Sequence, residues 1–338
     1  MTTQTLDTIP VHDPFILAHE PSQTYYMYTA ADQDRGMADG YGVSAYTSTD
    51  LRNWSGPHRV FDVPEDSWAE PKRAPWAPEV HEYNGRFYLF TTLHQPASAY
   101  PLPSDGGGTE ILVRQRGDFT YDFTPRRRSC VTAVADSPLG PFRLLDSQAS
   151  ITPEDFLAID GTLHIDDDGQ PWMVYAHEWV QTIDGTFEAI RLSDDLSRSV
   201  GEPVHLFRAS EGSWLRDLVP SSRSLAPYVT DGCQLYRLAS GALTMLWASY
   251  TKGPDGSDYI ETSATSPSGS LFGPWVQNEI LIGGNAGHGM IFDGFDGVRY
   301  LVFHRGMNTP VVRAEIVEVA DAGDQFRVVR DRPDLYRA

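Results

Sequence analysis

Short apolar segments rich in aromatic and β-branched residues recur five times along the chain. They occupy residues 25–30, 86–92, 170–176, 242–248 and 298–304. Their length and composition are typical of buried β-strands. A turn precedes each segment, and four of the five turns end in glycine, which tight hairpins favour. These turns are EPSQ at 20–23, Asn84-Gly85, Asp168-Gly169, Ser240-Gly241 and Asp296-Gly297.

Each turn lies between two predicted strands, and a third strand follows in every copy. The strands before the turns span residues 13–20, 77–84, 160–167, 231–238 and 288–295. The third strands span residues 42–50, 129–138, 187–195, 258–267 and 310–319. Four copies continue into a polar turn and an edge segment, at residues 48–54, 135–142, 192–203 and 265–275. The last copy departs from this pattern.

Five copies of a four-stranded unit predict an all-β, five-bladed β-propeller that forms a single domain over residues 1–338. One blade cannot bury both of its faces, but a closed ring of blades can. No linker separates the copies, which argues against two domains. The insertions at 96–110, 114–128 and 210–224 are expected to be loops, with the three arginines at 126–128 forming a solvated face.

The chain is strongly acidic. It carries 46 acidic and 26 basic residues, a formal net charge of −20. Such a surface repels nucleic acid and anionic membranes and favours a neutral partner such as a carbohydrate. The 8 Trp and 16 Tyr suit a protein that stacks rings on sugars, although all-β cores are rich in aromatic residues in any case.

Nothing in the sequence predicts an oxidising compartment or a membrane. The two cysteines, Cys130 and Cys233, give no disulfide framework. The first residues lack the basic start and apolar run of a signal peptide, and no apolar stretch has the length of a membrane helix. We therefore expect a cytoplasmic protein, while noting that a secreted protein with its leader removed would have the same features.

The first strand of each propeller blade lines the central axis, and all five strands run in the same direction. Their starting residues therefore meet at one mouth of the ring. These starts are Asp13, residues 76–79, Asp160, Asp231 and His288. Like charges this close raise one another's pKa, and such clusters are typical of functional sites. A single aspartate at a strand start commonly caps a turn, but three at the same point of a repeat favour a site.

The second strands return toward the same mouth, so the residues after them are expected to line a pocket there. These residues are His94, His177, Glu178, Ser249 and Arg305. Three tryptophans offer flat faces on which a sugar could stack, namely Trp76, Trp179 and Trp214.

Four motifs mark the blade starts. They are His12-Asp13-Pro14-Phe15, WAPEV at 76–80, IDGTLHIDDDGQPWMVY at 159–175, and GHGMIF at 287–292 followed by His304-Arg305. Each motif alone is weak, but the combination covers essentially the whole chain. Together the motifs resemble those of glycoside hydrolase family 43, the five-bladed propeller β-xylosidases and α-L-arabinofuranosidases.

The resemblance implies three catalytic carboxyl groups. Asp13 would be the general base that activates water, and Asp160 would orient the general acid and raise its pKa. The fourth blade would supply that acid, and its segment VTDGCQLYR at 229–237 places Asp231 where the family has Glu. Because Asp is one methylene shorter, Glu178 and Glu211 are alternative acids, and Glu178 is favoured because it follows a second strand.

The resemblance also implies how substrate is held. Arg305 resembles an arginine that contacts the sugar and the carboxylates. His288 resembles an axial histidine that in some members helps to hold a calcium ion or a water, while the chemistry itself requires no cofactor. The expected substrate-binding residues are Trp76, Glu79, His94, His177, Glu178, Trp214, His288 and Arg305.

These observations lead to the hypothesis of an inverting glycosidase that removes α-L-arabinofuranosyl or β-D-xylosyl units from plant-type oligosaccharides or polysaccharides. In such a mechanism one carboxylic acid protonates the glycosidic oxygen and a carboxylate on the opposite face deprotonates water. The two groups stand roughly 6.5–9.5 Å apart so that the water fits between them.

Two other functions remain open from the sequence. One is a sugar-binding propeller with weak or no hydrolysis, which the replacement of Glu by Asp231 favours. The other is a retaining glycosidase acting on another furanoside such as a fructoside, whose Asp nucleophile and Glu acid would stand about 5–5.5 Å apart. A protein-binding scaffold is disfavoured because its blades need no acidic residues at the axial starts.

Overall fold

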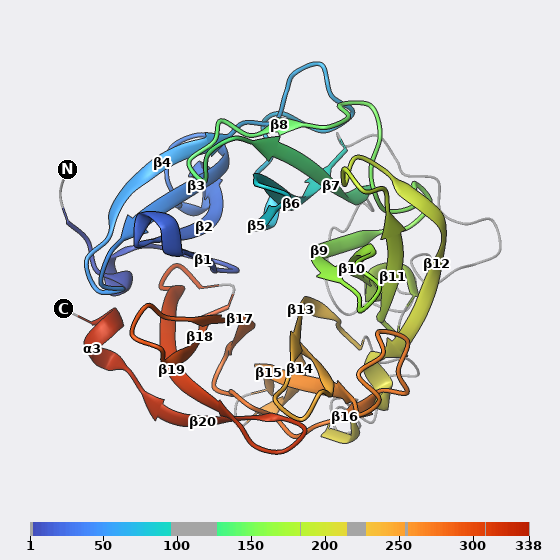
Figure 1. The fold of residues 1–338 in the computed structure, drawn as a ribbon. Coiled ribbons are helices and arrows are strands. Elements are labelled where there is room, and N and C mark those ends of the chain that lie inside the picture. Colours follow the sequence, from blue (N-terminus) through green and yellow to red (C-terminus); the bar gives the residue numbers. More distant parts are fainter. Residues whose placement is uncertain are drawn as a thin grey trace.

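The chain folds into five four-stranded antiparallel sheets arranged around a central axis (Figure 1). The computed structural model describes residues 3–95, 127–182, 184–214, 228–253, 256–307 and 309–337. Within every sheet the strands follow one another in sequence order, from the axis outward. This arrangement confirms the predicted five-bladed β-propeller.

The blades take their strands from consecutive stretches of the chain. Blade 1 consists of β1 (Phe15–His19), β2 (Thr24–Asp32), β3 (Tyr41–Ser48) and β4 (Ser55–Phe61). Blade 2 consists of β5 (Trp76–Tyr83), β6 (Arg86–His94), β7 (Arg128–Ala135) and β8 (Arg143–Leu144). Blade 3 consists of β9 (Ala158–Ile165), β10 (Pro171–His177), β11 (Thr186–Leu192) and β12 (Ser199–Arg208). Blade 4 consists of β13 (Asp231–Arg237), β14 (Leu243–Gly253), β15 (Gly256–Ser266) and β16 (Val276–Gln277). Blade 5 consists of β17 (Ala286–Asp293), β18 (Arg299–Arg305), β19 (Arg313–Asp321) and β20 (Phe326–Asp331).

Helical structure in the described residues is confined to single turns. The α-helical turns are α2 (Trp179–Thr182) and α3 (Pro333–Tyr336), and the 3-10 turns are η1 (Leu6–Thr8), η2 (Glu20–Ser22), η3 (Gln33–Arg35) and η4 (Ala209–Glu211). None of the helices in these residues is long and apolar enough to span a membrane.

The outermost strands differ from the expectation in two ways. Most of the predicted edge segments form the turns that lead into the outer strands, as at residues 48–54, which precede β4. The predicted departure of the last blade is wrong, because β20 pairs with β19 and completes a fourth strand. The pattern conceals β20 because only Phe326 of its six residues is buried. The insertions at 96–110 and most of 114–128 and 210–224 lie outside the described residues.

The apolar core lies mainly between neighbouring blades. Phe187 and Phe207 of blade 3 pack around Trp247 of blade 4, with ring centroids 5.7 Å from that of the tryptophan. Other clusters join blades 2 and 3, and blades 4 and 5. Each blade therefore depends on its two neighbours to bury its faces, as expected for a closed ring.

The N-terminal segment closes the ring between the first and last blades. Leu6 and Ile9 are fully buried in one cluster with Ile316 of β19 and Leu335 of α3. The backbone of Pro10 forms a bridge to Arg313 at the start of β19. The two ends of the described chain consequently lie near each other (Figure 1). Closure by apolar contacts fixes the blade starts relative to one another.

Four of the five blades begin with the same backbone bulge, and all five have a left-handed residue at this point. In blade 4, Asp231 pairs with Ala248 and Gln234 with Leu246, so three steps along β13 match two along β14. The same bulge occurs in blades 2, 3 and 5. The residue within each bulge has a left-handed backbone, and blade 1 has such a residue at the equivalent position. The φ angles are 50° at Asp13, 43° at Ala77, 57° at Asp160, 52° at Gly232 and 51° at His288.

Gly232→Ala is expected to lower the free energy of unfolding more than Gly169→Ala does. Both glycines have positive φ, so alanine costs roughly 1–2 kcal/mol of backbone strain at either position. At Gly232 the added Cβ would also lie 2.7 Å from ring atoms of His288, whereas at Gly169 nothing lies within 4 Å. This overpacking adds about 1–3 kcal/mol. Urea unfolding followed by tryptophan fluorescence measures both losses, and equal losses would contradict the expectation.

Candidate active site

The left-handed residues at the blade starts gather at one mouth of the ring. Asp13, Asp160 and His288 occupy this position in blades 1, 3 and 5. A left-handed non-glycine residue costs of order 1–3 kcal/mol and persists where the surrounding structure enforces it, commonly at functional sites. The bulges therefore hold two carboxylates and an imidazole at the axis.

Direct contacts link these side chains. Nδ1 of His288 lies 3.2 Å from Oδ1 of Asp13 and 3.8 Å from Oδ2 of Asp160. The backbone N–H of Gly232 donates to Oδ2 of Asp160 over 2.9 Å. Asp13, Asp160 and His288, which are distant in the chain, therefore lie together as expected.

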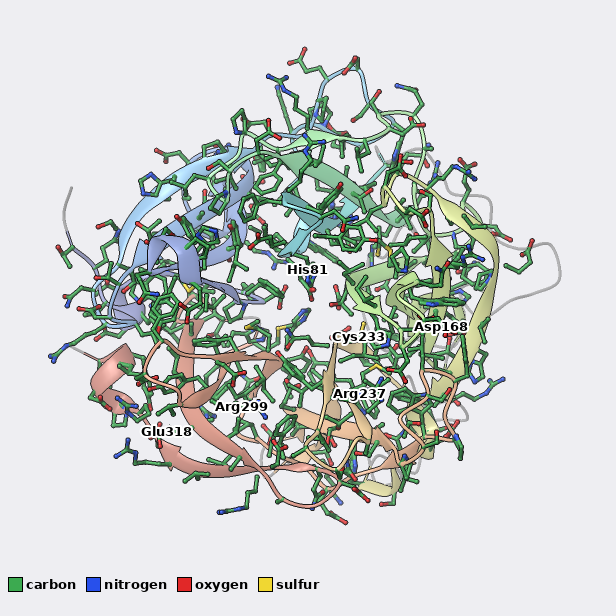
Figure 2. All side chains as sticks on the ribbon, viewed as in Figure 1. His81, Asp168, Cys233, Arg237, Arg299 and Glu318 are labelled. Carbon is green, nitrogen blue, oxygen red and sulfur yellow. The ribbon has the colours of Figure 1, made fainter. Side chains whose placement is uncertain are left out.

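Asp231 joins this cluster from a different backbone position. It precedes the left-handed residue of its blade, which is Gly232, whereas Asp13 and Asp160 are themselves the left-handed residues. The Tyr259 hydroxyl donates to Oδ2 of Asp231 over 3.2 Å. Cys233, which lies at the inner edge of blade 4 (Figure 2), directs its thiol to the carbonyl oxygen of Asp160 over 3.2 Å. Blade 4 is thus tied to blade 3 beside the carboxyl groups.

Burial and neighbouring charges give the three aspartates different proton affinities. Burial alone would raise the pKa of Asp13, but His288 and His304 outweigh it and hold that pKa well below its usual range. Burial raises the pKa of Asp160 to about 6, against the opposing charge of His288. Burial and the adjacent Asp160 raise the pKa of Asp231 well above its usual value. These surroundings therefore favour the ionised form of Asp13 and the protonated form of Asp231.

Asp160 raises the pKa of the neighbouring Asp231, so the two carboxyl groups compete for one shared proton. Asp160 receives the Gly232 N–H and lies within 4 Å of the His288 ring. Hydrogen bonds and a cation favour the ionised form of a carboxyl group. The shared proton is therefore assigned to Asp231.

His288 is the cation of the site. Burial lowers its pKa, but the carboxylates of Asp13, Asp160 and Asp231 overcome burial and raise that pKa to about 9. Behind it, buried Glu261 accepts the backbone N–H of Gly289 over 2.7 Å, and burial raises the Glu261 pKa to about 8.

Glu178 lies at the same mouth and is held by an arginine. Nη1 of Arg128 contacts both carboxylate oxygens of Glu178, at 2.5 and 2.7 Å, and both side chains are buried. The predicted solvated face at 126–128 is therefore wrong for Arg128. It is also wrong for Arg127, which pairs with Glu154 and lies over the ring of Trp68; residue 126 lies outside the described part of the chain.

Trp76 and His94 form an aromatic wall beside this arginine. Their ring centroids are 4.4 Å apart, and the Arg128 guanidinium lies 4.8 Å from the Trp76 ring centroid. Glu79 is buried deeper along the axis, where its Oε2 lies 2.9 Å from Nε2 of His81. The structure thus brings Trp76, His94 and Glu178 into one neighbourhood.

Other residues expected at the mouth have structural partners elsewhere. His177 stacks on Phe156, with ring centroids 4.0 Å apart, and bonds Gln181. Trp214 packs against Trp247 and donates its indole N–H to the carbonyl of Asn278. Trp179 begins α2.

The three remaining expectations are placed as follows. The Ser249 hydroxyl is buried and donates to the carbonyl of Val229. Glu211 is exposed and accepts the backbone N–H of Arg208. Arg305 pairs through Nε with Glu315 and donates through Nη1 to the carbonyls of Gly283 and Gly284. The contact of Arg305 with the aspartates implied by the family resemblance is not among these bonds.

Sequence reasoning missed Tyr259 and the role of His304. The His304 ring is fully buried, and its Nδ1 accepts the backbone N–H of Asp13 over 3.1 Å. Tyr259 stacks on this ring with an interplanar angle of 2°. The GHGMIF motif followed by His304 marked the region, but only the fold brings His304 to Asp13.

The residues around His288 do not fit the calcium ion that the resemblance implied. Calcium takes about 6–8 oxygen ligands, whereas Nδ1 of His288 faces two carboxylates and is protonated at neutral pH. The adjoining cavity, lined by Asp13, Glu79 and His288 among others, has a volume of about 10 Å³, which suits a single water. Ligand atoms of His12, Asp13 and His304 lie within 4.8 Å of one another, but Nδ1 of His304 already accepts a hydrogen bond from Asp13.

Comparisons with known proteins bear on this site. A family model described as glycosyl hydrolases family 43 matches residues 8–321. The extracellular exo-α-(1→5)-L-arabinofuranosidase of Cellvibrio japonicus is 26% identical over 329 residues, which cover 88% of this chain and 79% of that protein. The extracellular endo-α-(1→5)-L-arabinanase 1 of Bacillus subtilis is 24% identical over 173 residues, covering 50% of this chain and 44% of that protein.

Solved structures agree with the family match. An endo-arabinase from Bacteroides thetaiotaomicron is 33% identical, with a TM-score of 0.77 over 96% of this chain and 100% of that one. An α-L-arabinanase of Cellvibrio cellulosa, solved with arabinohexaose, shares the fold at 20% identity and a TM-score of 0.62, over 95% of this chain and 96% of that one.

The predicted cytoplasmic location is wrong in light of these relatives. Both curated relatives are extracellular enzymes, which contradicts the expectation. The reasoning failed because it rested on the absence of a recognisable signal peptide, which does not establish a cytoplasmic location.

Asp13→Asn is expected to lower the pKa of His288 from about 9, because the Asp13 carboxylate is the strongest charge that raises it. Titration of the histidine ring nitrogens by NMR measures the change. His164, whose pKa burial lowers to about 4 without a contribution from Asp13, serves as the internal control. An unchanged or higher His288 pKa would show that the two groups are not coupled as described.

Proposed function

The chain belongs to glycosyl hydrolase family 43, and we propose that this glycosidase hydrolyses α-L-arabinofuranosyl linkages with inversion at the anomeric carbon. The observation that carries the proposal is the contact of Asp13 and Asp160 with the same ring nitrogen of His288 at one mouth, with Asp231 beside them. The surroundings lower the pKa of Asp13 and raise that of Asp231, which favours the carboxylate form of Asp13 and the protonated form of Asp231. Inverting hydrolysis requires one group of each kind.

The choice of sugar rests on the relatives. Two curated relatives are an arabinofuranosidase and an arabinanase acting on α-(1→5) linkages, and the solved structure at 33% identity is an endo-arabinase. We therefore place arabinofuranosyl ahead of β-D-xylosyl substrates.

The proposed reaction has one chemical step. Asp231 transfers its proton to the glycosidic oxygen as the bond to the anomeric carbon breaks. Asp13 removes a proton from the water that attacks that carbon from the opposite face. The sugar leaves with inverted configuration; before the next turnover Asp13 releases its gained proton to solvent and Asp231 takes one up from solvent.

Asp160 is proposed to serve Asp231 in this scheme. Its charge is stabilised by the Gly232 N–H and by the His288 ring, and it opposes ionisation of Asp231. Glu178 is a poorer acid candidate than Asp231, because both of its oxygens face the Arg128 guanidinium. A guanidinium stays protonated and favours the carboxylate form of its partner.

A sugar-binding propeller without hydrolysis is the second candidate. The replacement of the family's Glu by Asp231 favours it, since a shorter acid reaches less far. The buried, proton-retaining environment of Asp231 argues for catalysis, because binding alone needs no raised carboxyl pKa.

Asp13→Asn and Asp231→Asn are each expected to lower kcat on a natural-type arabino-oligosaccharide by about 10²–10⁴-fold, the usual contribution of a general acid or base. Asp231→Asn should lose less with an aryl arabinofuranoside whose leaving group needs no proton, whereas Asp13→Asn should lose equally with both. Steady-state kinetics on the two substrates separates the roles.

Asp168→Asn is the matched control, because Asp168 is exposed on the hairpin between β9 and β10. Wild-type rates in Asp13→Asn, or an equal loss on both substrates in Asp231→Asn, would refute the assigned roles. Arabinan binding in a wild-type protein that hydrolyses nothing would favour the second candidate.

Hydrolysis of a panel of aryl glycosides is expected to be fastest for the α-L-arabinofuranoside. Proton NMR of the first-formed sugar should show the β-anomer before mutarotation, because water attacks from the face opposite the leaving group. Initial release of the α-anomer would indicate a retaining mechanism, and a preference for the β-D-xyloside would overturn the proposed substrate.

A further inference from the structure

Arg128 and Glu178 form a buried ion pair between two blades at the active-site mouth. Arg128 begins β7 of blade 2, and Glu178 follows β10 of blade 3. Their side chains are only 7% and 6% exposed, and Nη1 of Arg128 contacts both oxygens of Glu178. Burying two charges is costly unless they are paired closely. We therefore expect a buried ion pair beside the active site to have a role there.

The backbone directs Glu178 toward the cluster of aspartates. Its N–H donates to the carbonyl of Leu157, one residue before β9, and Asp160 lies three residues further along. Glu178 raises the pKa of both Asp160 and Asp231 through its charge. Its carboxyl group is therefore electrically part of the site, although its hydrogen bonds go to Arg128.

Arg128 is fixed on its other side by the aromatic wall. The guanidinium lies over the Trp76 ring, and the backbone of Arg128 pairs with that of His94. Burial raises the pKa of Glu178, and Arg128 acts against burial through its charge and its hydrogen bonds. Without the arginine, Glu178 would compete with Asp231 for the proton.

We infer that Arg128 and Glu178 are a positioning pair that keeps the leaving-group proton on Asp231. Arg128 holds Glu178 ionised, and the ionised Glu178 opposes the ionisation of Asp231. The inference rests on the proposed role of Asp231 as general acid. It adds a second negative neighbour, beside Asp160, that maintains this acid.

The groups that act on Asp231 come from blades 1, 3, 4 and 5. They are Asp160 of β9, Glu178 after β10, Tyr259 of β15, His288 of β17 and Asp13 before β1. Asp160, Glu178 and Asp13 oppose ionisation of Asp231, whereas His288 favours it. Glu178 raises the pKa of Asp231 and His288 lowers it. Without the charge of Glu178, Asp231 should therefore lose its proton at a lower pH.

Glu178→Gln tests the inference with little change of shape. The alkaline limb of the kcat/KM profile, which reports loss of the acid proton, is expected to move down by about one pH unit, the lower range for loss of a nearby charge. The position of the limb is the readout, because the level of activity would also report any contact of Glu178 with the substrate. A merely structural role would lower activity at all pH values and leave the limb in place.

Arg128→Met provides the sharper test, because it removes the opposite charge and should shift the limb in the same direction. Burial would then neutralise Glu178, and Asp231 would again lose a negative neighbour. If Arg128 acted on Asp231 directly, its removal would move the limb upward. The double variant Arg128→Met with Glu178→Gln leaves no unpaired buried charge, so it tests the inference even if the single arginine variant does not fold. Its limb should lie below that of the wild type but above that of Glu178→Gln, in which the unpaired Arg128 also favours the ionised form of Asp231.

Glu318→Gln is the matched control. Glu318 also pairs with arginines, Arg330 and Arg332, but it lies on β19 at the outer side of blade 5 (Figure 2). Its profile should coincide with that of the wild type.

A readout without turnover separates this inference from the proposed function. Carboxyl ¹³C NMR of protein labelled at aspartate Cγ, with Asp231→Asn to assign the resonance, follows the Asp231 proton directly. A lower Asp231 pKa in Glu178→Gln than in the wild type supports the inference. This holds even if the wild type hydrolyses no glycoside, a result that would contradict only the proposed function. An active wild type whose Asp231 resonance and alkaline limb are unmoved by Glu178→Gln overturns the inference.

Discussion

Four carboxyl groups and one imidazolium share a buried space at the mouth of the ring, and the carboxyl groups cannot all be ionised there. Like charges at short range in a poorly solvated site repel strongly. The site resolves this by distributing cations and donors unevenly. Asp13 lies against the His288 ring, Asp160 receives a backbone N–H, and Glu178 faces Arg128. Asp231 has the least support for a negative charge and keeps the proton.

The backbone conformation at the blade starts produces this uneven distribution. A left-handed residue lies at each blade start, and its residue type decides which chemical group lies beside the axis. Blades 1, 3 and 5 place Asp13, Asp160 and His288 there, whereas blade 4 places Gly232 and offers its N–H. The Cβ that this glycine lacks would occupy the space of the His288 ring. One repeated backbone position therefore supplies the proposed base, its neighbour Asp160, the imidazolium and the N–H donor, while the proposed acid precedes it.

The sequence predicted the features that are local or that repeat. Hairpin turns and alternating strands carry their signal within a few residues, and the five-fold repeat placed Asp13, Asp160 and His288 at one mouth. It could not predict pairings across blades. The adjacent arginines at 126–128 suggest a solvated face, because nothing near Arg128 in the sequence indicates a buried partner. That partner, Glu178, is 50 residues away. The Asp13–His304 bond spans 291 residues, and the register that separates Asp231 from the left-handed position is set by pairing with β14.

The shorter acid at Asp231 becomes understandable in terms of proton affinity. An aspartic acid in water has a pKa of about 3.9, against about 4.3 for glutamic acid, so Asp231 needs more help to hold a proton at neutral pH than a glutamate would. Burial supplies the largest share, and Asp160 the next. A further buried carboxylate would add to this help only if it stayed ionised, and in this chain a buried arginine faces that carboxylate. The substitution at residue 231 and the Arg128–Glu178 pair are then parts of one arrangement.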